Sequence, residues 1–209
     1  MSSVHVQDGF SPDINVKITA RENGRIVAVR KAHNVITNAG RYWALRRLGA
    51  ATLDLSPPTP HLTTLPMYMG IGCGGALQTD AGGLGLSTVQ TEQVTVQSCE
   101  DPVAVTAGVY LKRLYNQDLG STTYFPSDYR MVFITDFMET DISFAANQTT
   151  GSSKVVGTSV PLSEVSLHLS DAAPGVDPLS ALNAIAYNIC SPIVITPSVS
   201  LRVEWEWRI

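Results

Sequence analysis

Alternation of apolar and polar residues marks the beginning of the chain. Residues 13–20 alternate with a period of two, which is typical of a half-buried strand. The dipeptide Asn23-Gly24 then favours a tight hairpin turn, and residues 26–29 form a second apolar run. The pattern therefore predicts a β-hairpin near the N-terminus, after an extension formed by residues 1–12.

A second clear alternation occupies residues 201–209 and reaches the last residue. Trp205 and Trp207 belong to an apolar face, and charged side chains alternate with them on the other face. Chain ends usually fray, so an alternation that reaches Ile209 predicts a strand held inside a sheet rather than at its edge. Glu204 and Glu206 share their face with two arginines, which favours a ladder of ion pairs with neighbouring strands over an acid–base dyad.

One segment near the front has helical character. Thr37 or Asn38 can accept hydrogen bonds from the free amides of a helix start, and residues 39–48 gather their apolar side chains on one side. Arg46 and Arg47 lie largely opposite. They indicate either a solvated face or a salt-bridging patch for a neighbouring acidic subunit.

The remaining patterns are mostly strands separated by turn residues. Residues 129–138 are β-branched and aromatic. Residues 165–169 alternate and place His168 on their polar face, which predicts a surface or interface histidine. Residues 181–190 fit a helix or a strand. Stretches without a clear core pattern predict long loops at 51–66, 70–86, 98–128 and 146–159.

This order of elements favours a mainly β fold. Strands separated by turn signals, with one short helix after the N-terminal hairpin, are typical of an antiparallel β-sandwich of jelly-roll-like type. The chain has 209 residues without an internal repeat or a shift in composition. We therefore expect residues 1–209 to form a single domain.

Composition excludes several classes of protein. Charged residues make up 15% of the chain and hydrophobic residues 44%, against about 25% charged in typical soluble domains, which argues against disorder. The net charge of −4 argues against a general nucleic-acid binder. No apolar run approaches the ~20 residues of a membrane span, and no secretory signal opens the chain. Ten of the 14 basic residues are arginine, which indicates a surface that contacts protein.

Candidate chemistry is sparse. Cys73, Cys99 and Cys190 have no C-x-x-C spacing, so we expect reduced, small, semi-buried thiols rather than a metal site or disulfides. Residues 70–75 match G-x-G-x-x-G, but the glycine-rich sequence that follows does not suit the helix on which a pyrophosphate would sit. We expect close backbone approach there instead. The chain is predicted to be no enzyme, with no catalytic, cofactor-binding or metal-binding residues and no small-molecule substrate.

Several segments, taken in order, resemble a diffuse group of structural proteins from the neck, tail and fibre region of tailed bacteriophages. Residues 33–41 (HNVITNAGR) are similar to a phrase that opens a helix after a hairpin in that group. Residues 67–72 (MYMGIG) are similar to its apolar strand ending in G-x-G. Residues 160–167 (VPLSEVSL) and 201–205 (LRVEW) are similar to its last two strands.

The resemblance implies a non-enzymatic virion component with a β-sandwich body and no cofactor. Such a protein would assemble in the host cytoplasm as a symmetric homo-oligomer that contacts other virion proteins in the neck, collar or tail, without nucleic acid or membrane. The alternatives are a head decoration (cement) protein and a glycan-binding fibre module. The last would use a tryptophan as a sugar platform, whereas core packing is the favoured role of both C-terminal tryptophans. The candidate contact residues are Arg46, Arg47, Pro57, Pro58, Gly72, Gly74, Gly83, Trp205 and Trp207.

Overall fold

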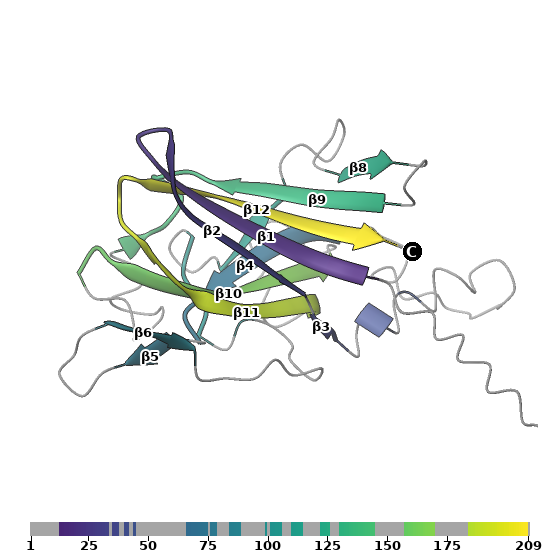
Figure 1. Cartoon of the computed structure of the whole chain (residues 1–209), viewed down its shortest axis with the longest axis horizontal. Helices are drawn as coiled ribbons and strands as arrows, with labels where there is room; N and C mark the ends of the chain where they lie inside the picture. The colour runs from purple at the N-terminus through teal and green to yellow at the C-terminus, as the bar shows by residue number, and fades with distance from the viewer. Residues whose placement is uncertain are drawn as a thin grey trace, which may run out of the picture.

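The strands of the computed structural model form two antiparallel sheets that pack face to face, with a two-stranded ribbon beside them (Figure 1). This confirms the predicted antiparallel β-sandwich. The structure describes residues 13–33, 35–37, 40–41, 44, 66–74, 76–78, 84–88, 99, 101–105, 110–114, 122–125, 130–144, 157–169 and 184–208.

Each sheet has five strands. The first sheet has the order β2 (Arg25–His33), β1 (Asp13–Glu22), β12 (Val199–Arg208), β9 (Arg130–Phe137), β8 (Thr122–Phe125). The second sheet has the order β3 (Val35–Ile36), β11 (Ala184–Ile195), β10 (Val160–Leu169), β4 (Pro66–Gly72), β7 (Leu111–Arg113). The ribbon pairs β5 (Ala76–Gln78) with β6 (Leu84–Thr88).

The N-terminal hairpin forms as its turn residues predict. Asn23 and Gly24 have φ values of 49° and 79°, and two consecutive positive φ values are the geometry that an Asn-Gly hairpin turn requires. The register changes from Ala20 opposite Ala28 to Arg21 opposite Ile26. One residue of β2 is therefore left over in a β-bulge, which increases the local twist of the hairpin.

The C-terminal strand lies inside its sheet, as predicted. β12 pairs with β1 on one side and with β9 on the other. Its alternation continues across both neighbours, since Val16, Trp205 and Phe133 stand opposite one another in register. The alternation thus builds a continuous apolar surface on three strands of the first sheet.

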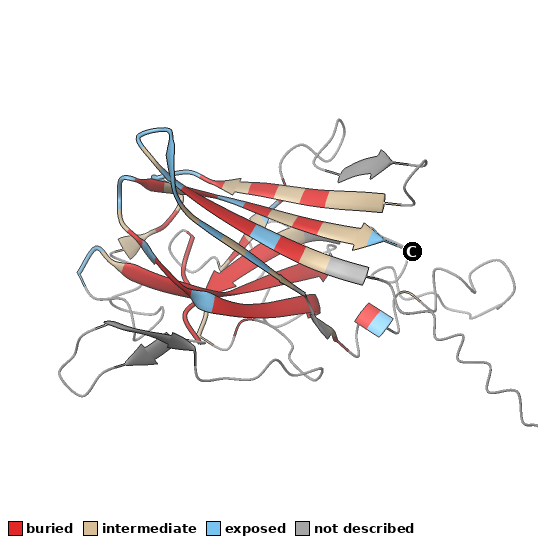
Figure 2. Ribbon diagram, viewed as in Figure 1, coloured by how far each residue is buried: buried red, intermediate tan, exposed pale blue. Residues whose placement is uncertain are grey.

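The core lies between the two sheets. Figure 2 shows buried residues alternating with less buried ones along β1, β9 and β12 of the first sheet, and nearly continuous burial along β10 and β11 of the second. Trp205, Phe133 and Ile18 come from the first sheet, while Leu167 and Ile185 come from the second. Side chains of this size dominate the free energy of core formation.

The second sheet corrects two expectations. Residues 165–169 were expected to form a half-buried strand, but Ser166 and His168 are fully buried, as is Val165 on the opposite face. The strand is therefore covered on both sides, because other parts of the chain lie over its polar face. Residues 184–195, which include most of the segment that fitted either a helix or a strand, form the strand β11.

Two of the predicted long loops contain strands. The end of β4 and the ribbon β5–β6 occupy part of 70–86, and β7 and β8 occupy part of 98–128. β5 and β7 have three residues each, β8 has four, and β6 contains a glycine, so the alternation within each of these strands is weak. The N-terminal extension 1–12, residues 51–65 and residues 146–156 lie outside the described residues.

The Thr37 side chain makes the contacts that a helix N-cap requires. The Thr37 hydroxyl accepts a hydrogen bond from the Gly40 amide at 3.1 Å, and the Arg41 amide donates to the Thr37 carbonyl at 2.9 Å. A Cβ at Gly40 would collide with the carbonyl oxygen of Ile185. Only a residue without a side chain lets this turn approach β11 so closely. Residues 40, 41 and 44 are helical, and the rest of the predicted helix lies outside the described residues.

We expect Trp205→Ala to lower the free energy of unfolding by about 3–5 kcal/mol, because it removes a large, fully buried ring from the core. Urea denaturation followed by circular dichroism measures this loss. Trp207→Ala is the matched control, since Trp207 is only half-buried, and its loss should be clearly smaller. Equal stability of Trp205→Ala and the unchanged protein would contradict the assignment of Trp205 to the core.

Candidate interaction surface

The structure gives the two C-terminal tryptophans different surroundings. Trp205 is fully buried, which confirms core packing and corrects its candidacy as a contact residue: a ring without exposed surface cannot serve as a sugar platform or meet a partner. Trp207 is half-buried and sets its ring edge-on against Phe133, with centroids 5.9 Å apart. Its place at the border of the core leaves part of the ring at the surface.

Gly72 and Gly74 are also buried, so their prediction as contact residues is wrong. A Cβ at either position would collide with the carboxylate of Glu164. These glycines are therefore needed for contact within the chain rather than with a partner. The other five candidates, Arg46, Arg47, Pro57, Pro58 and Gly83, lie outside the described residues.

The Glu164 carboxylate is the centre of a buried polar cluster. It accepts hydrogen bonds from the Gly74 amide at 2.7 Å, from the Asp101 amide at 3.3 Å and from the Tyr187 hydroxyl. Next to it, Ser166 is within 2.8 Å of His168 Nε2 and 3.3 Å of the Cys99 sulfur. A buried charge is tolerated only with such partners, so the cluster joins β10, β11 and the segments around Gly74 and Asp101.

Two alternative chemistries can be assessed from this geometry. Residues 76–78 after the glycine turn form a strand, so the helix that a dinucleotide site requires does not begin there. The prediction of close backbone approach at the glycines is confirmed. Within the described ranges, His, Cys, Asp and Glu side chains form no cluster suited to holding a metal ion.

The structural role of Glu164 and His168 in this buried cluster was not predicted from the sequence. His168 was expected at the surface, but it is fully buried. The available signal was the near absence of charge in residues 160–169, where Glu164 is the only acidic or basic residue apart from the histidine.

The outer face of the first sheet, meaning the face turned away from the core, carries a ladder of ion pairs. Lys17 pairs with Glu204 at 2.6 Å, and Arg130 pairs with Glu206 at 3.0 Å. The Arg202 guanidinium donates two hydrogen bonds of 2.7 Å to Asp136. The ladder predicted from the alternation of charges in the last strand is confirmed. Its pairs are partly exposed, so each contributes little to stability.

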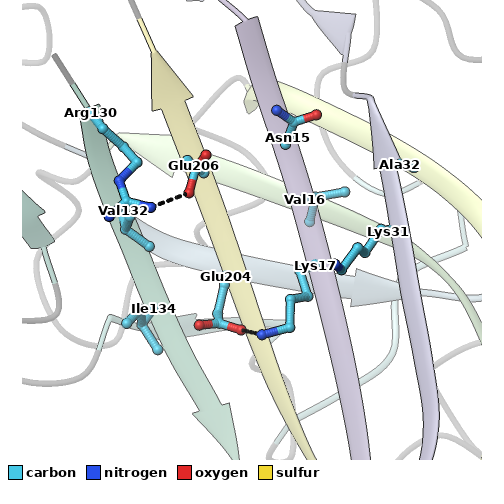
Figure 3. A pocket seen from close by; sticks show the side chains of 10 residues that line it. All are labelled: Asn15, Val16, Lys17, Lys31, Ala32, Arg130, Val132, Ile134, Glu204 and Glu206. Atoms are coloured by element: carbon cyan, nitrogen blue, oxygen red, sulfur yellow. Dashed lines mark hydrogen bonds and ion pairs between the residues drawn. The ribbon is translucent and has the colours of Figure 1, made fainter. Parts of the chain in front are cut away.

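A groove of about 600 Å³ runs across this outer face (Figure 3). Lys17 and Lys31 lie on its β1–β2 side, and Val132 and Ile134 lie on its β9 side. The groove thus combines charged and apolar walls on one open sheet. Its lining residues are Asn15, Val16, Lys17, Lys31, Ala32, Arg130, Val132, Ile134, Glu204 and Glu206.

The side of residues 25–31 that does not pair with β1, here called the β2 edge, is the apolar part of this surface. Ile26, Val27 and Val29 are 58%, 53% and 40% exposed. β2 is the last strand of the first sheet in the described part of the chain. An edge strand of nine residues with such side chains is a template for another strand.

Comparison with known proteins finds no matching family model, no matching curated protein and no matching solved structure. Among the described residues, no helix is long and apolar enough to cross a membrane. The arrangement that the structure presents is an open, groove-bearing sheet face with an apolar edge.

We expect Glu164→Gln to destabilise the protein by about 1.5–3 kcal/mol. The glutamine oxygen is a weaker hydrogen-bond acceptor than a carboxylate, and the glutamine NH₂ group would face an N–H or O–H group of Gly74, Asp101 or Tyr187 that itself donates a hydrogen bond. Thermal and urea unfolding measure this change. Glu204→Gln is the matched control on an exposed ion pair and should cost at most about 1 kcal/mol. Similar losses in the two variants would contradict the central role of Glu164.

We further expect stability to fall at alkaline pH through Cys99. Burial, assisted by the charge of Glu164, raises the pKa of the Cys99 thiol well above its ordinary value of 9.0. The unfolded thiol ionises first, so the contribution of Cys99 to stability is complete below pH 9.0 and is lost as pH rises through the higher folded pKa. Unfolding curves of the unchanged protein and Cys99→Ser should diverge above that pH, and a constant difference would refute the assignment.

Proposed function

We propose that this chain is a non-enzymatic structural component of a tailed bacteriophage virion, assembled in the host cytoplasm as a symmetric homo-oligomer of the neck, collar or tail region. The observation that carries the proposal is the convergence of the segments that resemble such proteins. Residues 33–41, 67–72 and 160–167 supply β3 with its helix start, β4 and β10. All three belong to the second sheet, where β4 pairs with β10 and β11 lies between β10 and β3, while the fourth segment, residues 201–205, belongs to β12 of the first sheet.

The residues that define these segments contact one another or the strand between them. The Thr37 amide donates to the Ile185 carbonyl at 3.2 Å, and its hydroxyl donates to the Ala184 carbonyl. Gly70 lies so close to Ser166 that a Cβ would be 2.6 Å from the serine hydroxyl. The resemblance is therefore carried by residues with a common structural task, and this supports it as more than a chance similarity of short phrases.

The surface of the sandwich supports an assembly role. The outer face of the first sheet is an open grooved face with a nine-residue edge strand. Strand edges and loops that add onto neighbouring chains provide affinity through main-chain hydrogen bonds. In a closed ring, each subunit holds two neighbours, so that modest contacts become durable.

The proposal is tested on particles. An antibody raised against the recombinant chain should label tailed particles from the source culture at the head–tail junction or the tail. Quantitative mass spectrometry of purified particles should give about six or twelve copies, as a ring of cyclic symmetry requires. Hundreds of copies would instead indicate head decoration, and absence from purified particles would refute the virion role.

A second measurement tests the oligomer. In sedimentation at high protein concentration, the purified chain should form a species heavier than the 22.4 kDa monomer. The chain should also bind to, and sediment with, particles that lack this protein. A glycan array is the comparison for the fibre-module alternative. Specific glycan binding by a monomer would overturn the proposed assembly role.

A further inference from the structure

The β2 edge contrasts with the rest of the sandwich. Three of the five large apolar side chains exposed in the described residues, Ile26, Val27 and Val29, belong to this one strand. Natural proteins normally shorten, cover or charge the edges of their sheets, because a long apolar edge recruits further strands. β2 joins this apolar stretch to three basic residues and a β-bulge, features that discourage indiscriminate pairing and leave the edge open to a strand of complementary charge.

The edge is fixed in position before any partner arrives. The Arg30 side chain donates to the carbonyls of Ser191 at 3.1 Å and Pro192 at 3.4 Å in β11. These bonds hold β2 against the second sheet, while the other side of β2 pairs with β1. A partner therefore meets an ordered strand, and the entropy cost of binding is correspondingly small.

Charge disfavours the symmetric pairing of β2 with a second copy of itself. The strand contains Arg25, Arg30 and Lys31 and no acidic residue. Antiparallel pairing of two copies centred on Ala28 would set Arg25 directly opposite Lys31 at both ends. Like charges directly opposite each other destabilise a strand pair.

Lys31 adds an independent reason for an acidic partner. It stands directly opposite Lys17 in the β1–β2 register, and the carboxylate nearest to Lys17 is Glu204, with which Lys17 pairs at 2.6 Å. Among the described residues, no hydrogen bond or ion pair joins the Lys31 side chain. A carboxylate brought to this position would relieve the repulsion between the two ammonium groups.

We propose that the β2 edge binds an extended, carboxylate-bearing segment of another protein, which pairs with β2 as an additional strand of the first sheet. Main-chain hydrogen bonds would supply the affinity, Ile26 and Val29 would contact apolar residues of the segment, and Lys31 would select its acidic residues. This inference names the partner chemistry of the proposed assembly surface, and so rests on the proposed function.

The experiment uses the full chain and two synthetic peptides of equal length, one alternating glutamate with valine and one alternating lysine with valine. Titration calorimetry at low salt should show at least tenfold tighter binding of the acidic peptide. Lys31→Glu should reverse the preference, since its new carboxylate stands opposite Lys17 and leaves the fold intact. Arg41→Glu is the matched control: it makes the same change of charge on the exposed helical turn after β3 and should keep the original preference.

Amide hydrogen exchange separates strand pairing from attraction by charge alone. Bound acidic peptide should protect the backbone amides of residues 26–29. Protection confined to the groove around Glu204, or no saturable binding at the millimolar concentrations that a tethered neighbour reaches, would overturn the proposal. If the chain self-associates and Lys31→Glu changes this self-association, the partner of the β2 edge is a second copy of the chain instead. These outcomes do not depend on antibody labelling of particles. A failure of the proposed strand pairing at the β2 edge can therefore be distinguished from a failure of the proposed virion role.

Discussion

The buried carboxylate of Glu164 is the constraint on which the second sheet depends. Removing a charge from water is costly unless donors replace the lost hydration, and three different parts of the chain supply those donors. Gly72 and Gly74 leave the space that the carboxylate occupies. The pairing of β4 with β10, the place of the Asp101 segment and the orientation of Tyr187 are thereby determined together.

This arrangement makes the two sheets unequal. The second sheet is covered on its outer side by the chain itself, so that even Ser166 and His168 are fully buried. The first sheet keeps an outer face of ion pairs, a groove and an exposed edge. Both sheets contribute to the core, but only the first presents an open outer face. The proposed assembly role would use both properties, since the subunits of an oligomer fold before they meet their neighbours.

The elements predicted correctly from the sequence are those whose local residue pattern matches the surroundings of their side chains in the fold. The Asn23-Gly24 turn needs only its own backbone geometry. β12 alternates because one of its faces meets the core and the other meets charged neighbours, and the same pattern predicted its ion-pair ladder. The Thr37 cap is likewise a local interaction between residues three apart. Prediction worked where neighbours in sequence decide the structure.

Prediction was wrong where distant segments decide it. Gly72 and Gly74 were expected to contact a partner, but the space beside them is filled by the Glu164 carboxylate, which is about 90 residues away in sequence. Trp205 could have faced a partner or the core, and only the opposing sheet buries it. Alternation and turn residues by themselves determined the N-terminal hairpin, the strand β12 and the class of fold. The tertiary structure decided which polar face is covered and which edge is open, because burial depends on what packs from outside a strand, and no pattern within the strand contains that information.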